Sequence, residues 1–288
     1  MMRTLLKIFK IVIPIVLVSC SAKDNGAQIQ LDEARSLYAE KQYALAEQRL
    51  DSLHILYPKS LDERKAALAL LDSVRRDSQI QQIAICDSLI NINTPVLDSL
   101  KKLFVYQRNK QYQDKGFYIP KESATDGRIT ATTLRSGVEE NGTLYIESVF
   151  VGNSKKHFKL KASTKDGSFA ETLLVTDDGL NYRFSSGDIQ HEIIKFSGAD
   201  ENGIARFISA NAGQPLTLTL DGQAKYTYTL SQPIKTAISK SYQLSMLMQQ
   251  IDSLGEEKKK AEFHLEYLNN GKKIVIDDDR TTIEEQGN

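Results

Sequence analysis

The sequence contains no tryptophan, two cysteines and six prolines in 288 residues, and its 37 Lys plus Arg balance 37 Asp plus Glu. Two cysteines cannot form a disulfide framework. Zero net charge gives no global attraction to nucleic acid, so we expect no nucleic-acid partner. With 26% charged residues and an ordinary glycine content, the chain is typical of folded globular proteins rather than disordered or collagen-like ones. The length suggests two domains.

Sequence signatures of common enzyme chemistry are also missing. There is no Gly-x-Ser-x-Gly, no His-Glu-x-x-His, no Cys-x-x-Cys, no phosphate loop and no dinucleotide fingerprint. We therefore expect no enzymatic activity, no metal ion and no cofactor. An enzyme built from dispersed carboxylates, such as Glu139-Glu140 or Asp177-Asp178, is an alternative. Both pairs lie at predicted turns, so we favour solvated turns.

The amino terminus has no apolar run long enough to span a bilayer. Residues 11–18 are apolar, follow three basic residues and contain Pro14, which fits the core of a secretory signal peptide. The junction Leu17-Val18-Ser19-Cys20 resembles the lipobox of bacterial lipoproteins. The resemblance implies a signal peptide over residues 1–19, a lipidated Cys20 and a membrane as partner. A plain signal peptide with an incidental cysteine and a short membrane anchor are the alternatives.

Residues 1–19 contain three basic residues, so their removal leaves 34 basic and 37 acidic residues. Electrostatic attraction to anionic lipid is then weak, and acyl chains on Cys20 would hold the protein on the membrane. The residue after Cys20 is Ser21 and not Asp, which resembles lipoproteins that are sent to the outer membrane. We expect an envelope protein anchored in the outer membrane through a linker over residues 20–29, facing either the periplasm or the cell surface.

Glycine is distributed unevenly and divides the rest of the chain. None occurs from residue 27 to 115, whereas ten of the sixteen fall between residues 128 and 230. The first stretch predicts helices, and the second predicts strands and turns. The expected fold class is α+β, with a helical hairpin and a long antiparallel helical stalk flanking an antiparallel β-sandwich or barrel-like head.

Residues 30–58 resemble a tetratricopeptide repeat, two antiparallel helices closed by a proline. The matching positions are Ala34, Leu37, Tyr43, Ala46, Leu50, Leu53 and Pro58. Since one repeat cannot bury its own apolar face, a helix over residues 61–74 should cover it. We favour a structural hairpin over a peptide-binding array.

Two apolar stripes predict the stalk. The first arm covers residues 59–115, as two helices or one sharply kinked helix at Asn93-Thr94-Pro95. The second arm covers residues 233–269, and residues 270–288 form a polar tail. Such stripes usually pack on each other, but the same stripe could make an intermolecular coiled coil. Cys86, in the first arm, is expected to be a buried structural thiol rather than a reactive one. The stripes consist of Ile85, Leu89, Ile92, Val96, Leu100 and Leu103, and of Ile234, Ile238, Ser241, Leu244, Met248, Ile251, Leu254, Ala261, Leu265 and Leu268.

Residues 128–230 should form the head as an antiparallel β domain, because short β-branched and aromatic runs alternate with turns such as Asn141-Gly142. Residues 128–134 and 205–210 are among the expected strands. Tyr226 and Tyr228 alternate onto one face and are candidates for stacking on a sugar, although core packing is favoured.

The sequence therefore predicts a non-enzymatic, membrane-anchored lipoprotein that serves as a structural or protein-interaction module. Its protein partner is not defined by the sequence, and a homo-oligomer through the stalk is one option. The alternative is a lipoprotein that binds carbohydrate or another ligand through the β domain.

Overall fold

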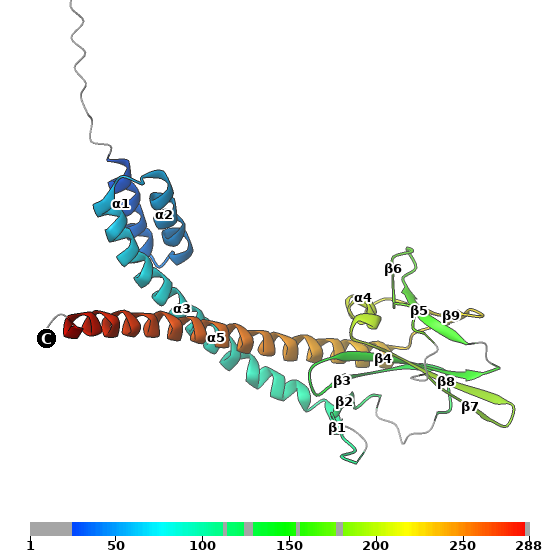
Figure 1. Cartoon of the computed structure of the whole chain (residues 1–288). Coiled ribbons are helices and arrows are strands. Elements are labelled where there is room, and N and C mark those ends of the chain that lie inside the picture. The colour runs from blue at the N-terminus through cyan, green and yellow to red at the C-terminus, as the bar shows by residue number, and fades with distance from the viewer. Residues whose placement is uncertain (1–24, 112–113, 124–128, 154–155, 177–180, 286–288) are drawn as a thin grey trace, which may run out of the picture. The chain divides into compact units, whose positions relative to one another are not determined.

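The computed structural model describes the backbone of residues 25–111, 114–123, 129–153, 156–176 and 181–285, and the side chains of these ranges as far as residue 270. The fold is α+β, as predicted, with long helices and antiparallel sheets (Figure 1). The chain divides into two compact units at the boundary between Ser78 and Gln79. That boundary falls within helix α3 (Leu61–Lys101).

The first unit is built from a helical hairpin and the start of α3. Helices α1 (Gly26–Ala39) and α2 (Tyr43–Leu56) are joined by a tight turn in which Lys41 has a left-handed φ of 61°. The start of α3 covers their apolar face, as the sequence predicted for an isolated repeat. The shared core consists of Leu31, Ala34, Ala46, Leu50, Leu53, Ala67, Leu71 and Val74.

The second unit contains two antiparallel sheets (Figure 1). The larger sheet has the spatial order β1 (Phe104–Gln107), β2 (Phe117–Pro120), β3 (Thr133–Glu139), β4 (Leu144–Gly152), β8 (Ile189–Ser197) and β7 (Tyr182–Ser186). The smaller sheet has the order β10 (Tyr226–Thr229), β9 (Thr217–Gly222), β5 (His157–Ser163) and β6 (Phe169–Glu171). Both sheets contribute to a single apolar core, so the predicted sandwich-like head is present.

Helix α5 (Gln232–Glu285) and the smaller sheet cover the same face of the larger sheet, which we call the inner face. Ser136 on β3 and Ser241 on α5 are both buried, with their hydroxyl oxygens 2.9 Å apart. Ser245 on α5 donates to the carbonyl oxygen of Gly142 at 2.6 Å. These small side chains let the helix approach the sheet closely. The first half of α5 is therefore part of the head rather than of a separate stalk.

Three predicted element boundaries were wrong. The first helical arm ends at Lys101 instead of residue 115, and β1 and β2 lie before the expected start of the β domain at residue 128. Aromatic and β-branched residues occupy three of the four positions in each strand, which favours pairing over helix. Of the two alternatives at Asn93-Thr94-Pro95, two separate helices are excluded, because α3 is continuous through Pro95. Packing of Leu97 and Leu100 on the head core supports the turns beside this proline. The expected polar tail continues α5 as helical backbone to Glu285, and residues 272–285 contain no glycine or proline.

The predicted strand at residues 205–210 is instead helix α4 (Ile204–Ala210), which follows a short 3₁₀ turn, η1 (Gly198–Glu201). The Glu201 carboxylate accepts hydrogen bonds from the backbone N–H groups of Gly203 and Ala205, so it caps the helix. Ile204 and Ile208 are one helical turn apart and both enter the core. An acidic cap and helical spacing outweigh the β propensity of this segment.

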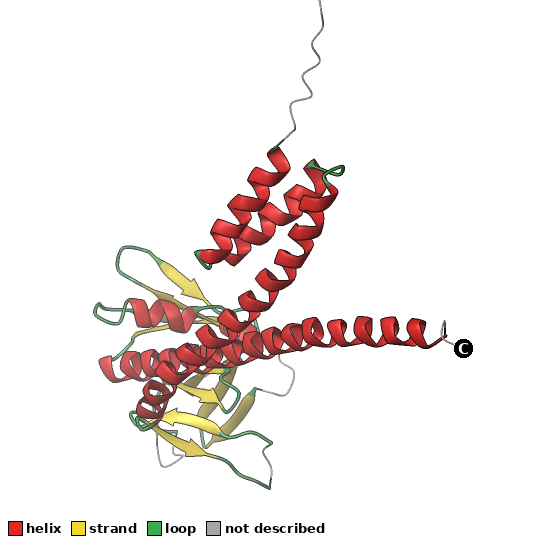
Figure 2. Cartoon of the chain, turned by 90° about the vertical axis from the view of Figure 1, so that its left-hand side faces the viewer, coloured by secondary structure: helices red, strands yellow, loops and turns green. Residues whose placement is uncertain are grey.

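The predicted mutual packing of the two stalk stripes was also wrong. Figures 1 and 2 both show α3 crossing α5 rather than running alongside it. The apolar stripe of α5 enters the head core through Ile238 and Leu244. Because the inner face of a sheet offers more apolar area than one helix stripe, α5 packs on the sheet and leaves most of the predicted α3 stripe uncovered.

Candidate functional site

Helix α3 has a face that contacts the rest of the second unit and is centred on Cys86. Cys86 is buried, which confirms the predicted buried thiol, and Ala261 on α5 is buried as well. Asp87 on α3 pairs with Lys258 on α5, the carboxylate and ammonium being 2.7 Å apart. At about 100° per residue, Leu97 lies within about 40° of Cys86 and packs on the head core. This face holds α3 against α5 and the head.

A second apolar face lies about a quarter turn away on the same helix. At about 100° per residue its members fall between about 60° and 120° to one side of Cys86. We call this face the exposed α3 stripe. It consists of Ile85, Leu89, Ile92 and Val96, whose exposed fractions are 45, 37, 62 and 54%. A contiguous exposed row of large aliphatic side chains marks an interaction site more often than single exposed residues do.

Charge is depleted around the exposed α3 stripe. From residue 79 to residue 97 the only charged residue is Asp87, in a chain with 26% charged residues. That carboxylate already pairs with Lys258 of the same chain. The residues bordering the stripe on the side away from α5 are Gln81, Ser88 and Pro95, which are exposed and uncharged. Depletion of charge beside aliphatic side chains is the composition of an interface core rather than of a solvated helix surface.

The structure also places Tyr226, one of the two predicted ligand-binding residues, at a pocket of 180 Å³ at one end of the two sheets. The Tyr226 ring meets the Phe150 ring edge-on, with centroids 5.2 Å apart, and Tyr226 is 44% exposed. The pocket is lined by Phe150, Asn153, His157, Leu220, Ala224, Lys225 and Tyr226. It is smaller than most small-molecule sites.

Tyr228 shares the face of Tyr226, as predicted, and their ring centroids are 6.0 Å apart. It packs against the head core instead of extending an exposed row. Its hydroxyl is buried and has no hydrogen-bond partner within the described ranges. Burial raises the pKa of Tyr228 above its ordinary value. The structure thus leaves Tyr226 accessible and makes Tyr228 part of the core.

A buried polar network that no sequence motif revealed lies beneath this pocket. His157 on the smaller sheet pairs through Nδ1 with the Glu192 carboxylate on the larger sheet, and its Nε2 lies 2.9 Å from Ser148 Oγ. Arg183 Nε donates to the other carboxylate oxygen of Glu192 at 2.5 Å. Burial alone would raise the pKa of Glu192, but the hydrogen bonds from His157 and Arg183 outweigh it and hold that pKa below its ordinary value. The sequence signal was weak, because the partners are separated by 9 to 35 positions.

The order Ser, His, Glu matches the partners of a hydrolytic triad. Ser148 is fully buried, however, and is not among the residues that line the pocket. A substrate carbonyl therefore has no path to the Ser148 hydroxyl in this conformation. The network links the two sheets and is best described as a structural polar cluster.

A row of charges crosses the opposite, outer face of the larger sheet. Glu147 lies between Arg135 and Lys195 on the neighbouring strands. Burial raises the pKa of Glu147, and the charges of Lys195 and Arg135 only partly offset this effect. Lys195 bonds to Glu139 at 3.2 Å and lies 4.3 Å from the centre of the Tyr145 ring. These charges are engaged within the chain.

Of the carboxylates that the sequence suggested as a catalytic pair, Glu139 and Glu140 are described, and each makes a different contact within the chain. Glu139 bonds to Lys195, whereas Glu140 accepts a hydrogen bond from the Gly116 N–H at 3.0 Å. That bond, only partly opposed by burial, lowers the pKa of Glu140. Asp177 and Asp178 lie outside the described residues.

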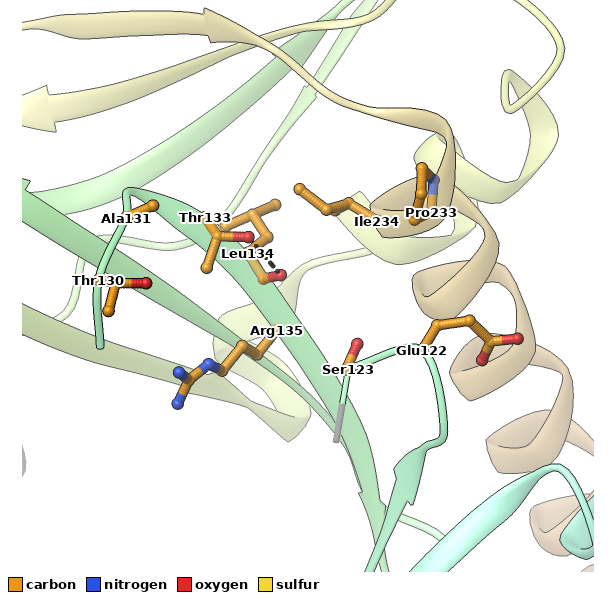
Figure 3. Close-up of a pocket in the computed structure, with 9 residues that line it drawn as sticks. All are labelled: Glu122, Ser123, Thr130, Ala131, Thr133, Leu134, Arg135, Pro233 and Ile234. Carbon is orange, nitrogen blue, oxygen red and sulfur yellow. Dashed lines mark hydrogen bonds between the residues drawn. The ribbon is translucent and has the colours of Figure 1, made fainter. Parts of the chain in front are cut away.

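A pocket of 250 Å³ lies between β3 and the start of α5 (Figure 3). The side chains of its two charged residues do not point at a common place in the pocket. Figure 3 shows Arg135 pointing away from Pro233, whereas Glu122 lies beside α5. The Glu122 carboxylate forms an ion pair with Lys240. Ligand sites need several polar groups aimed at one point, so this cavity is a poor candidate.

Within the described ranges, no cluster of three or more His, Cys, Asp or Glu side chains is arranged to hold a metal ion. The helices of the same ranges include none with the length and apolar character needed to cross a bilayer. Cys20 and the rest of the lipobox lie outside the described residues. A scan of known protein families and a search of curated proteins found no match to this chain.

Proposed function

We propose that this protein is a lipid-anchored module of the bacterial cell envelope that acts by binding another protein rather than by catalysis. The observation that carries the proposal is the exposed α3 stripe. Its four aliphatic side chains are 37 to 62% exposed on a helix segment with a single, internally paired charge. Leaving such a surface in water forgoes the free energy of burying it, on the order of 25 cal/mol per Å².

The anchoring part of the proposal rests on Leu17-Val18-Ser19-Cys20 and the apolar segment before it. Replacing Cys20 with serine removes the thiol that would be acylated. The variant should move from the membrane fraction to the soluble fraction, and mass spectrometry of the wild-type protein should show acylated Cys20. Equal membrane association of both proteins would contradict lipid anchoring.

Protein binding can be tested with a photo-crosslinking residue at Ile92 in the full-length, membrane-bound protein. Ile92 lies on the stripe and is 62% exposed. The matched control is Asn91, which is also exposed on α3 but lies about 100° further round the helix. A protein adduct that forms at position 92 and not at position 91 supports the proposal. Absence of any adduct at positions 89, 92 and 96 contradicts it.

Ligand binding at the sheet pocket is a second candidate, favoured by the exposed Tyr226 ring against Phe150. An aromatic ring that is half exposed beside an apolar cavity can stack on a sugar or another flat group. Titration with a panel of soluble glycans, followed by NMR, should shift signals of the β9–β10 hairpin. Tyr226→Ala should abolish the shifts, whereas Tyr182→Ala, at an exposed tyrosine of the other sheet, should leave them unchanged.

A further inference from the structure

The exposed α3 stripe has the spacing of a coiled-coil seam. Its members follow one another at intervals of four, three and four residues, the alternation that keeps one side of a helix facing a partner helix. Ile85 and Ile92 are equivalent positions in successive heptads, as are Leu89 and Val96. The partner that this spacing fits is therefore another α-helix with the same repeat.

The borders of the stripe narrow the choice of partner helix. Most coiled coils select partners through charged residues beside the seam, but here the bordering residues Gln81, Ser88 and Pro95 carry no charge. Two copies of α3 could meet without bringing like charges together, and a helix with charged borders would gain no ion pairs. A self-complementary patch of this kind is what a two-fold symmetric contact requires.

The size of the stripe argues against a permanent dimer in free solution. Four half-exposed aliphatic side chains offer far less than the ~800 Å² per partner of a standard interface. Anchoring changes this balance, because two copies confined to one membrane surface meet at a higher effective concentration than two copies in free solution. Cys20 lies 65 residues before Ile85, so in two chains anchored on one membrane the amino-terminal end of each α3 is the end connected to the anchor.

We propose that the exposed α3 stripe pairs with the same stripe of a second copy of this chain, in parallel and in register, when both copies are on one membrane. The parallel orientation rests on the proposed lipid anchor. The contact buries Ile85, Leu89, Ile92 and Val96 against their counterparts. It leaves the buried Cys86 face packed within the chain and the sheet pocket accessible.

Disulfide cross-linking of the full-length protein in membranes tests orientation and partner together. In a parallel pair, Ile85→Cys lies opposite itself and should form a dimer under mild oxidation. In an antiparallel pair centred on the stripe, residue 85 would oppose residue 96, about 16 Å from its own counterpart, and could not form the bond. Asn91→Cys is the matched exposed control, and the wild-type protein controls for Cys86.

A second variant shows that any cross-link depends on the stripe. This variant carries Leu89→Glu and Ile92→Glu in addition to Ile85→Cys. Its cross-linked fraction should be lower by about ten-fold or more, because charges buried without partners destabilise the contact. A ten-fold change needs only ~1.4 kcal/mol, and the burial of such charges costs more than that. Both sites are exposed, so circular dichroism should show an unchanged fold. Equal cross-linking at positions 85 and 91 would overturn the self-pairing.

The two proposals fail in different ways. If position 85 does not cross-link but the photo-crosslinker at position 92 captures a different protein, self-pairing is wrong and the interaction function stands. If the photo-crosslinker captures nothing, both proposals are wrong. Dimer formation at position 85 that the double glutamate variant abolishes supports both.

Discussion

His157 Nε2 lies 2.9 Å from Ser148 Oγ, and this contact joins a strand of the smaller sheet to a strand of the larger one. On its other side the imidazole pairs with Glu192, which is itself bound by Arg183. Ser148, His157 and Glu192 are all buried. Polar groups in such a position stabilise a structure only while every partner is present. The alignment of the two sheets should therefore depend on this network.

Glu192→Gln should destabilise the second unit by about 3 kcal/mol, because it removes the buried carboxylate that pairs with His157 and with the partly buried Arg183 guanidinium. Denaturant unfolding followed by circular dichroism measures the change. Glu256→Gln, at an exposed helical ion pair, is the control and should leave the stability nearly unchanged, because solvent screens an exposed pair. Equal effects of the two substitutions would show that the network does not hold the sheets together.

The same carboxylate should make stability depend on pH. Since the pKa of Glu192 is lower in the folded protein, its contribution is present above the unfolded pKa of a glutamate, about 4.3. That contribution is lost as pH falls through the folded pKa. The stability difference between wild type and Glu192→Gln should be constant from pH 7 to about pH 5 and then narrow at lower pH. A difference that widens on acidification would contradict this sign.

Lys41→Gly should stabilise the helical hairpin by about 0.5–1 kcal/mol, since glycine adopts a left-handed backbone without steric cost. Lys41 has a φ of 61° in the turn between α1 and α2. Glu40→Gly is the matched control, because Glu40 has an ordinary φ of −81° and gains nothing from glycine. Amide hydrogen exchange of α1 and α2 in the whole protein should slow for the first variant and not for the second.

The sequence was informative where local chemistry decides the structure. Pro58, the glycine-free stretch and the Asn141-Gly142 turn correctly predicted a helical pair and a sheet-rich segment. Periodicity also identified the apolar stripes, but it could not say which surface covers each one. Ile238 and Leu244 pack on a sheet formed from residues distant in the sequence, and this tertiary pairing leaves Ile92 exposed.

For the candidate sites too, the sequence identified single residues but not the tertiary contacts that bring them together. The exposed stripe consists of residues that the sequence assigned to packing within the chain, with an intermolecular coiled coil as the alternative. The sequence identified the residues but could not show that the chain leaves them exposed. Tyr226 was named from strand alternation, whereas Phe150 and His157 join it only because β4 ends and β5 begins beside the β9–β10 hairpin. The Glu192 network had no motif, since its members meet across two sheets whose pairing the sequence does not specify.

Ala261→Leu should loosen the point where α3 crosses α5. Ala261 is buried at the crossing, where the short Cys86 side chain is also buried. A larger side chain there has no space unless the helices separate, and such overpacking typically costs 1–3 kcal/mol. The Asp87–Lys258 pair, 2.7 Å apart, should lengthen, and amides at residues 82–90 and 254–265 should exchange faster. Ala84→Leu is the control, because Ala84 is exposed on α3, two residues from Cys86, and the larger side chain there should leave these amides protected. Faster exchange in both variants would mean that the crossing is not close-packed.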